Sequence, residues 1–221
     1  MGRRTIACMT ATRADYPRVK PVLREIARRP GLDLKLIVTG AHLSRAFGHT
    51  VDLIKRDGFE IAQRVPMYAE DARGRGDSVY DMTKATARCM DGMADALRAI
   101  APDLFLITVD RVETLAAAAG ALMNLPLFHI QGGEVTGTID ESIRHAVTKL
   151  AHVHFPATPD AAERITHCPH GRGTGACASG RLPLRGFHPI PAAATEGDIG
   201  AALRLRSGQA AGDLRPASGD Q

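Results

Sequence analysis

The sequence has no tryptophan and few aromatic residues, with three tyrosines and six phenylalanines among 221 residues. It also lacks a strong excess of one charge, because the formal net charge is only +4 and the arginines are scattered along the chain. Proteins that bind nucleic acid usually gather basic residues on one face and often add aromatic side chains. We therefore expect no nucleic-acid partner.

Long apolar runs are also missing. No stretch approaches the roughly 20 consecutive apolar residues that a membrane-spanning helix requires. The first residues do not form the apolar segment of a secretory signal peptide. These features predict a protein without a membrane partner and with a cytoplasmic location.

Cysteine is scarce, and none of the four cysteines forms a CxxC pair. Cys8 and Cys89 lie in apolar periodic segments, which is typical of reduced residues in a core. Cys168 and Cys177 have histidines nearby, but their spacing is not that of a zinc finger or ribbon. We therefore expect no metal site.

Short apolar segments alternate with segments of helical periodicity. The expected strands are residues 5–9, 32–38, 59–65, 103–109, 127–130 and 153–156. The expected helices begin at Pro17 and near residues 140–142, or span residues 78–100, 113–123 and 160–165. Strands that are apolar throughout and separated by helices indicate a parallel sheet covered on both faces. The predicted fold is α/β, a Rossmann-like doubly wound parallel sheet.

Reactive side chains follow four of the expected strands. In doubly wound sheets, ligands bind beyond the carboxyl ends of the strands. The residues expected there are Arg13 and Asp15, His42, Asp110 and Arg111, and Gln131 with Glu134. Their convergence at one end of the sheet predicts a functional site.

The residue types at this end suggest phosphate binding. Arg13, with Arg18 and Lys20, could bind phosphate, because a guanidinium can contact two phosphate oxygens at once. A solvated first helical turn explains the same three residues. Asp110 ends an apolar strand, where its carboxylate must be either solvated or held for a task.

Three acids and two bases lie near the start of the helix expected from residue 140. Glu134, Asp140 and Glu141 lie within eight residues, and like charges held close can raise one pKa and create a general acid or base. Alternatively, Asp140 is an N-cap that accepts hydrogen bonds from backbone N–H groups. Glu141, Arg144 and His145 have helical spacing and would share one face near the positive end of the helix dipole, suited to an anion or to proton transfer.

The chain divides in two by its sequence pattern. Periodicity extends to Ile165, so residues 1–165 form the predicted Rossmann-like domain. Residues 166–221 show no lasting period and are rich in glycine, alanine, proline and arginine. They are predicted to be an irregular or disordered tail.

Four sequence motifs resemble those of one enzyme family. They are TRADY at residues 12–16, TGAHL at 39–43, DRVE at 110–113 and, above all, the stretch from His129 to His154 that contains GTIDESIRH. Together they resemble the hydrolysing UDP-N-acetylglucosamine 2-epimerases of sialic-acid and related nonulosonic-acid synthesis. The resemblance covers residues 4–165.

The resemblance implies a fold, a reaction and partners. The fold would be the N-terminal half of a two-domain glycosyltransferase-B-like enzyme, with the active site between the domains. The reaction would convert UDP-N-acetylglucosamine, or a related nucleotide sugar, to N-acetylmannosamine and UDP without metal, NAD or another cofactor. Family members associate through this domain, so a homo-oligomer is expected.

Site residues also follow from the resemblance. The catalytic residues would be Asp110, Asp140 and Arg144, with a carboxylate transferring the proton and the arginine orienting or neutralising it. The substrate-binding residues would be Arg13, Arg18, His42, Gln131, Glu134, Glu141 and His145.

Three positions depart from the family pattern. Val109 stands where a glycine is usual, and Arg18 replaces a lysine. Gln131 stands where a glutamate or histidine is usual, and an amide cannot act as an acid or base near neutral pH. Proton transfer at that position is therefore not expected.

The resemblance ends well before the family's second domain, which supplies contacts to uracil and diphosphate. A shift of reading frame near residues 166–169 would explain this, because a frame shifted by one nucleotide can restore family-like sequence. We therefore expect a truncated chain that is weakly active or inactive alone. The alternative is a non-catalytic module that binds a nucleotide sugar or another subunit.

Overall fold

The structure is a computed structural model that describes residues 2–69, 78–108 and 110–167. Six parallel strands form one sheet in the order β3-β2-β1-β4-β5-β6. The strands are β1 (Arg4–Thr10), β2 (Leu32–Thr39), β3 (Ile61–Val65), β4 (Leu104–Thr108), β5 (Leu127–Ile130) and β6 (Val153–Phe155). This order confirms the predicted doubly wound fold.

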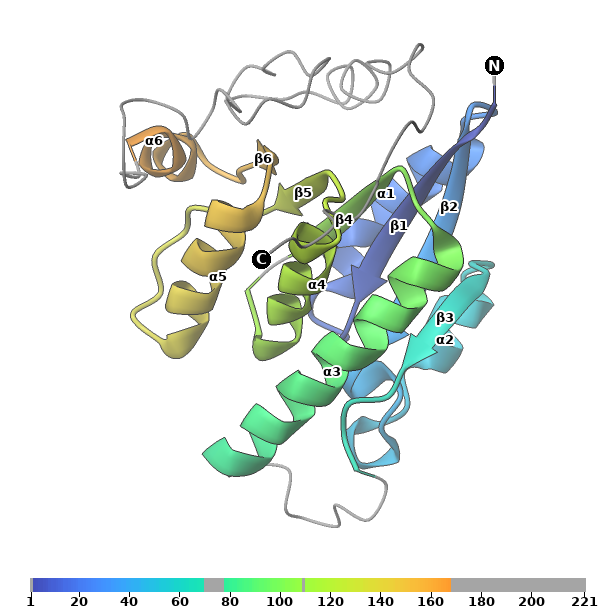
Figure 1. Cartoon of the computed structure of the whole chain (residues 1–221), viewed down its shortest axis with the longest axis horizontal. Helices are drawn as coiled ribbons and strands as arrows, with labels where there is room; N and C mark the ends of the chain where they lie inside the picture. The colour runs from blue at the N-terminus through green and yellow to red at the C-terminus, as the bar shows by residue number, and fades with distance from the viewer. Residues whose placement is uncertain (1, 70–77, 109, 168–221) are drawn as a thin grey trace, which may run out of the picture.

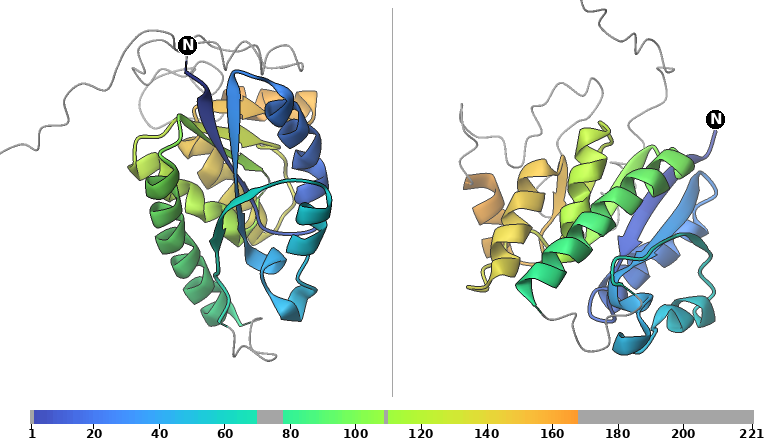
Figure 2. Two further views of the ribbon diagram at one scale, coloured as in Figure 1. Left: turned by 90° about the vertical axis from the view of Figure 1, so that its right-hand side faces the viewer. Right: turned by 60° about the horizontal axis from the view of Figure 1, so that its bottom comes forward.

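Helices cover both faces of the sheet. The α-helices are α1 (Tyr16–Arg28), α2 (Val51–Arg56), α3 (Val79–Ile100), α4 (Ala117–Leu122), α5 (Ile139–Leu150) and α6 (Pro159–His167). Short 3-10 helices are η1 (Gly40–His42), η2 (Arg45–Phe47) and η3 (Val112–Ala116). Helices α3, α4 and α5 lie side by side on one face (Figure 1), and α1 and α2 lie on the other (Figure 2, left).

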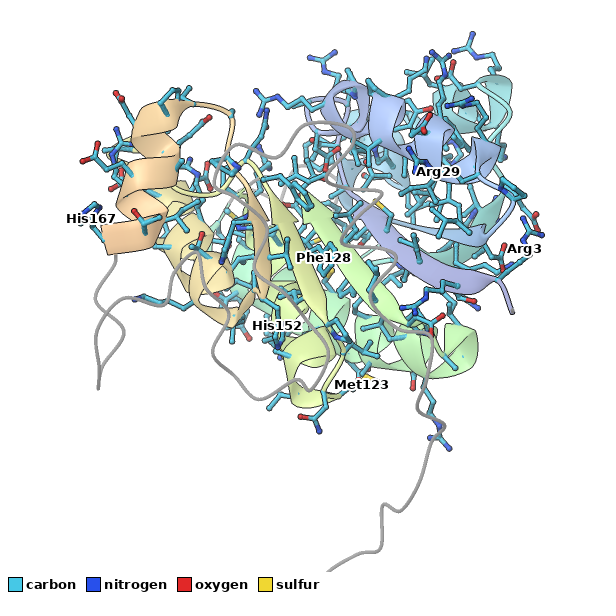
Figure 3. All side chains as sticks on the ribbon, turned by 90° about the horizontal axis from the view of Figure 1, so that it is seen from above. Arg3, Arg29, Met123, Phe128, His152 and His167 are labelled. Atoms are coloured by element: carbon cyan, nitrogen blue, oxygen red, sulfur yellow. The ribbon has the colours of Figure 1, made fainter. Side chains whose placement is uncertain are left out.

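Alternation along the strands builds a separate core on each face. In β1, Ile6 and Cys8 pack beneath α1, whereas Ala7 and Met9 pack toward α3. Phe128 of β5 is buried on the α1 side and lies over the central strands in Figure 3, whereas Arg3 lies at the edge of the molecule. The sheet is therefore buried on both faces, as its apolar strands predicted.

The long helix α3 shows how local sequence sets an element. Ser78 is its N-cap and accepts a hydrogen bond from the Asp81 N–H at 3.1 Å. Cys89, Met93 and Leu97 recur every four residues and are buried, so they form the stripe that faces the sheet. The helix ends at Ala101, whose φ of 48° is left-handed.

The predicted elements are found with shifted boundaries. The strand expected from residue 59 begins at Ile61, and the helix expected over residues 113–123 is instead η3 followed by the shorter α4. Helix α2 was not predicted because six residues are too few to show a helical period. Val109, Cys168, Cys177 and residues 168–221 lie outside the described residues.

Two further predictions can be compared with the structure. Cys8 and Cys89 are free and buried, as expected of reduced core residues. Within residues 2–69, 78–108 and 110–167, no helix has the length and apolar character needed to cross a membrane.

Candidate functional site

The predicted residues gather where the chain changes direction across the sheet. β1 and β4 are neighbours in the sheet, although β2 and β3 lie between them in sequence. Crevices that hold ligands form beyond the carboxyl ends of strands at such a switch point. Arg13 follows β1 and Asp110 follows β4, so both lie at this position.

A buried arginine joins two of the loops at this end. The Arg144 side chain is 1% exposed, and its Nε donates to Asp110 Oδ2 at 3.0 Å. Its Nη2 also donates to the same oxygen, and its Nη1 donates to the Glu134 carbonyl. Asp110 keeps 23% of its side chain exposed. The predicted partnership of Arg144 with a carboxylate is therefore present, and the carboxylate still faces the surface.

Asp140 lies one helical turn before Arg144, in the first turn of α5. It is partly exposed and is not the N-cap, because Thr138 occupies that position. The alternative explanation of Asp140 as a cap is therefore wrong. Asp140 and Asp110 are two carboxylates on different elements, with Arg144 on the same helix as one and bonded to the other.

Glu141 has a different role from the one its neighbouring acids suggested. Its Oε2 accepts hydrogen bonds from the backbone N–H groups of Gly137 at 2.6 Å and Thr136 at 2.7 Å. These bonds lower the pKa of Glu141, so this carboxyl is not a general acid created by like charges. The Glu141 carboxylate instead holds the loop before α5 in shape.

The predicted shared face of α5 is divided. His145 Nε2 lies 3.7 Å from Glu141 Oε1 at the partly exposed surface, whereas Arg144 is buried against Asp110. A residue four positions along a helix shares a face with its partner, but adjacent residues point about 100° apart. Arg144 therefore belongs with Asp110, and His145 belongs with Glu141.

Gln131 links the end of β5 to α1. Its side-chain Oε1 accepts a hydrogen bond from Arg18 Nη1 at 3.1 Å, and its backbone N–H donates to the Phe155 carbonyl at 2.8 Å. Its φ of 63° is left-handed, which is uncommon for a residue other than glycine. The structure thus brings Arg18 and Gln131, two of the predicted substrate-binding residues, together at the surface.

The turn after Gln131 requires glycine. Gly133 has a φ of 84°, and a Cβ built there would lie 2.4 Å from the Ala161 carbonyl oxygen of α6. Arg164 of α6 donates to the Gly133 carbonyl at 2.8 Å. Helix α6 therefore packs directly against the turn that leads to Glu134, whose own carbonyl is bonded to Arg144.

Arg13 and His42 are separated by burial. Arg13 is exposed at the surface, as a residue that contacts a ligand should be. His42 is fully buried, and both ring nitrogens lie within hydrogen-bond distance of threonine hydroxyls. The structure therefore places His42 behind the surface of the predicted site, where no part of its side chain is accessible to a ligand.

The sequence analysis did not single out Glu113, which is fully buried. Its Oε1 accepts from the Tyr68 hydroxyl at 3.3 Å, and its Oε2 lies 3.5 Å from Nε of half-exposed Arg111. Although burial opposes the charge of Arg111, the Glu113 carboxylate raises its pKa above the ordinary value. An acid three residues after Asp110 was the only signal, and acids at the start of a helix are commonplace.

Two other features carry less chemistry. An apolar pocket lies on the α1 face beside Val22, Leu106 and Phe128, and its lining offers no polar group to orient a substrate. In the part of the chain that the structure describes, no group of three or more histidine, cysteine or acidic side chains is arranged to hold a metal ion.

Sequence comparison relates this chain to one family. The family model described as UDP-N-acetylglucosamine 2-epimerase matches residues 24–170. UDP-N,N'-diacetylbacillosamine 2-epimerase (hydrolyzing) of Legionella pneumophila is 39% identical over 163 residues, which are 73% of this chain and 42% of that protein. UDP-N-acetylglucosamine 2-epimerase of Neisseria meningitidis is 37% identical over 161 residues, which are 72% of this chain and 41% of that one.

Structural comparison gives the same fold. The crystal structure of UDP-GlcNAc 2-epimerase from Neisseria meningitidis bound to UDP-GlcNAc superposes with a TM-score of 0.60 at 19% identity. The match covers 72% of this chain and 42% of that one. This chain thus spans about two fifths of the length of the curated relatives it matches.

Proposed function

Because this chain belongs to the UDP-N-acetylglucosamine 2-epimerase family, we propose that it carries the sugar-facing residues of a hydrolysing nucleotide-sugar 2-epimerase. One observation carries the proposal. Arg144 is buried and bonded to Asp110 at the switch point of the sheet, while Asp140 lies one turn away on the same helix. Two partly exposed carboxylates therefore lie at the end of the sheet where a substrate would bind, and the buried Arg144 guanidinium orients one of them.

The chemistry needs a base beside C2 and stabilisation of charge at C1. A carboxylate of Asp110 or Asp140 takes the C2 proton, the C1–O bond to the diphosphate breaks with its electron pair, and a C1=C2 double bond forms. Water then adds its oxygen to C1 and a proton returns to C2 on the other face, giving the 2-epimer. Arg144 fixes Asp110 and balances its charge through both steps.

The substrate we propose is UDP-N-acetylglucosamine or a relative that also has an acetamido group at C2. The Legionella relative is named for UDP-N,N'-diacetylbacillosamine, which supports this wider class. We place the product in sialic-acid or related nonulosonic-acid synthesis, the protein in the cytoplasm, and its working form as a homo-oligomer. Arg13 and Arg18, both exposed, are proposed to contact the diphosphate.

The test measures both products and proton exchange. The purified chain is incubated with UDP-N-acetylglucosamine in D2O, and UDP release is followed together with deuterium at C2 of the sugar. Epimerisation through C2 requires UDP and deuterated N-acetylmannosamine in equal amounts, and Asp110→Asn should abolish both. UDP release without deuterium at C2 would contradict the proposed chemistry.

A second function is a binding or subunit-interaction module without catalysis. Exposed apolar residues near the start of α3 and α5 favour it, since such residues often mark an interaction surface. Both helices begin at the carboxyl end of the sheet, where the predicted site lies. The apolar residues are Val79 and Tyr80, at 83% and 70% exposed, and Val135 and Ile139, at 58% and 66%. Binding of UDP-N-acetylglucosamine with no UDP release would support this function.

A further inference from the structure

A buried polar network lies directly behind exposed Arg13. Asp15 is 4% exposed, and its Oδ1 accepts from the Thr10 hydroxyl at 2.9 Å and the Thr12 N–H at 3.0 Å. Its Oδ2 accepts from the Ala11 N–H at 2.9 Å. Both carboxylate oxygens therefore hold the loop on which Arg13 lies.

His42 extends this network from β1 to the loop after β2. Its Nε2 lies 3.1 Å from Thr10 Oγ1, and its Nδ1 lies 2.7 Å from Thr50 Oγ1. An ionised Asp15 can only accept hydrogen bonds, so the Thr10 hydroxyl must use its single proton toward Asp15. Thr10 then accepts from Nε2–H of His42, while Nδ1 and the Thr50 hydroxyl can pair in either direction. Donor counting therefore places a proton on Nε2 of His42.

The backbone joins the same two loops. The His42 N–H donates to the Ala11 carbonyl at 3.1 Å. Gly40 has a φ of 58°, and a Cβ there would lie 2.7 Å from the same carbonyl oxygen. The loop after β2 thus packs closely against the loop after β1, and side chain and backbone fix the position of residues 10–15 together.

We propose that His42 is a positioning residue that acts through Thr10 and Asp15 on Arg13, and that it does not contact the substrate. Arg13 then presents its guanidinium to an anion of the phosphate class from a loop that is already ordered. Binding loses less conformational entropy when the ligand-contacting loop is ordered beforehand. The target anion rests on the proposed function, in which Arg13 contacts the diphosphate of a nucleotide sugar.

Coupling between the two residues provides the first test. Binding of inorganic pyrophosphate and of UDP to the full chain is measured calorimetrically for His42→Ala, Arg13→Ala and the double variant. We expect His42→Ala to weaken binding about tenfold and to add almost nothing once Arg13 is removed. Equal losses in both backgrounds, or no loss in His42→Ala, would overturn the proposal.

Two milder variants guard against misfolding. His42→Gln offers an N–H donor and an oxygen acceptor, so we expect it to recover most of the pyrophosphate affinity that His42→Ala loses. Thr50→Val removes only the hydroxyl that pairs with Nδ1 and should weaken binding less than His42→Ala. Failure of His42→Gln to recover affinity in a folded protein would count against the network.

The protonation state of His42 provides a test that needs no ligand. Nitrogen-15 NMR of the chain, which has nine histidines, is compared with that of His42→Gln to assign the missing signals. We expect a proton on Nε2. A ring protonated at Nδ1 alone overturns the proposal. This outcome does not depend on UDP release, so failure of the epimerase proposal would be recognised separately.

Discussion

The loops after β1 and β2 differ from those after β4 and β5 in where their polar side chains lie. In the first pair, Asp15 and His42 are buried and bonded to backbone or to neighbouring hydroxyls. Beyond β4 and β5, Asp110 and, in the first turn of α5, Asp140 remain partly exposed, although Glu113 and Arg144 are buried. The buried Asp15 and His42 can only shape the site, and they do so behind exposed Arg13, whereas the partly exposed Asp110 and Asp140 can contact a substrate themselves. We call the end of the sheet at β1 and β2 the sealed side, and the end at β4 and β5, including the start of α5, the open side.

The largest effect is expected on the open side, from Arg144→Met. This change removes every hydrogen bond that holds Asp110 and the Glu134 carbonyl to α5. UDP release should fall about a thousandfold, because the carboxylate loses both its orientation and its counter-charge. The matched control is Arg28→Met, since Arg28 is 77% exposed and pairs with Glu25 one turn earlier on its own helix. Equal activity in Arg144→Met and Arg28→Met would contradict a role for Arg144 in orienting Asp110.

On the sealed side, Gly40→Ala should affect stability more than chemistry. The new Cβ would meet the Ala11 carbonyl oxygen in a left-handed backbone, at a cost of about 3 kcal/mol from strain and overpacking together. Gly48→Ala is the control, because its φ of 87° is also left-handed but nothing lies near the added atom. It should cost about 1 kcal/mol. Urea unfolding of both variants measures the difference, and equal costs would show that the two loops are not closely packed.

The bond between Arg18 and Gln131 crosses from one side to the other. Gln131→Glu would convert it to an exposed ion pair and reduce the positive charge that Arg18 offers to a phosphate. We expect UDP to bind about threefold more weakly, since exposed ion pairs contribute less than about 1 kcal/mol. Titration at two salt concentrations checks this, because the loss should shrink as salt screens the pair. Tighter binding would argue against Arg18 as an anion ligand.

The smallest effect is expected from Glu141. It lies on the open side, but it holds a loop in shape, as Asp15 does on the sealed side. Backbone N–H groups of Gly137 and Thr136 lower the pKa of Glu141 below its ordinary value of 4.5. Its charge therefore stabilises the folded state fully at pH values above that ordinary pKa. That contribution disappears as the pH falls through the lowered pKa. The thermal midpoint of Glu141→Gln should therefore lie slightly below that of the unchanged chain at pH 7, and the two should converge on acidification. A gap that widens at low pH would contradict this assignment.

The sequence pattern predicted the fold and the end of the sheet where the site lies, because both depend on hydrophobic periodicity and on the order of strands and helices. The apolar strands indicated a parallel sheet, and the rule for strand ends brought Arg13, Asp110 and Gln131 to one end of it. Asp140 and Arg144 were added by the family resemblance. The pattern could not show which way each side chain points. Glu141 and Arg144 are both polar at helical spacing, yet one binds backbone N–H groups outside the helix and the other lies buried against Asp110. That choice depends on the loop that precedes α5, whose shape has no periodic signature.

His42 and Glu113 illustrate the remaining difficulty. Each is a polar residue just beyond a strand, where either burial or exposure is compatible with the sequence. Burial of His42 requires Thr10, which is 32 residues away, and burial of Glu113 next to Arg111 requires Tyr68, which is 45 residues away. A single sequence reveals such partners only after the fold has brought them together.

The contact between Gly133 and α6 sets a limit on where this protein can be divided. Helix α6 follows β6 and has few residues, so it would be an obvious segment to delete when designing a minimal fragment. Yet Ala161 lies against the backbone of Gly133, and Arg164 holds the Gly133 carbonyl. Removing α6 would leave the turn between Gln131 and Glu134 without its support, so an engineered fragment or a graft of this site should carry β5, α5 and α6 as one unit.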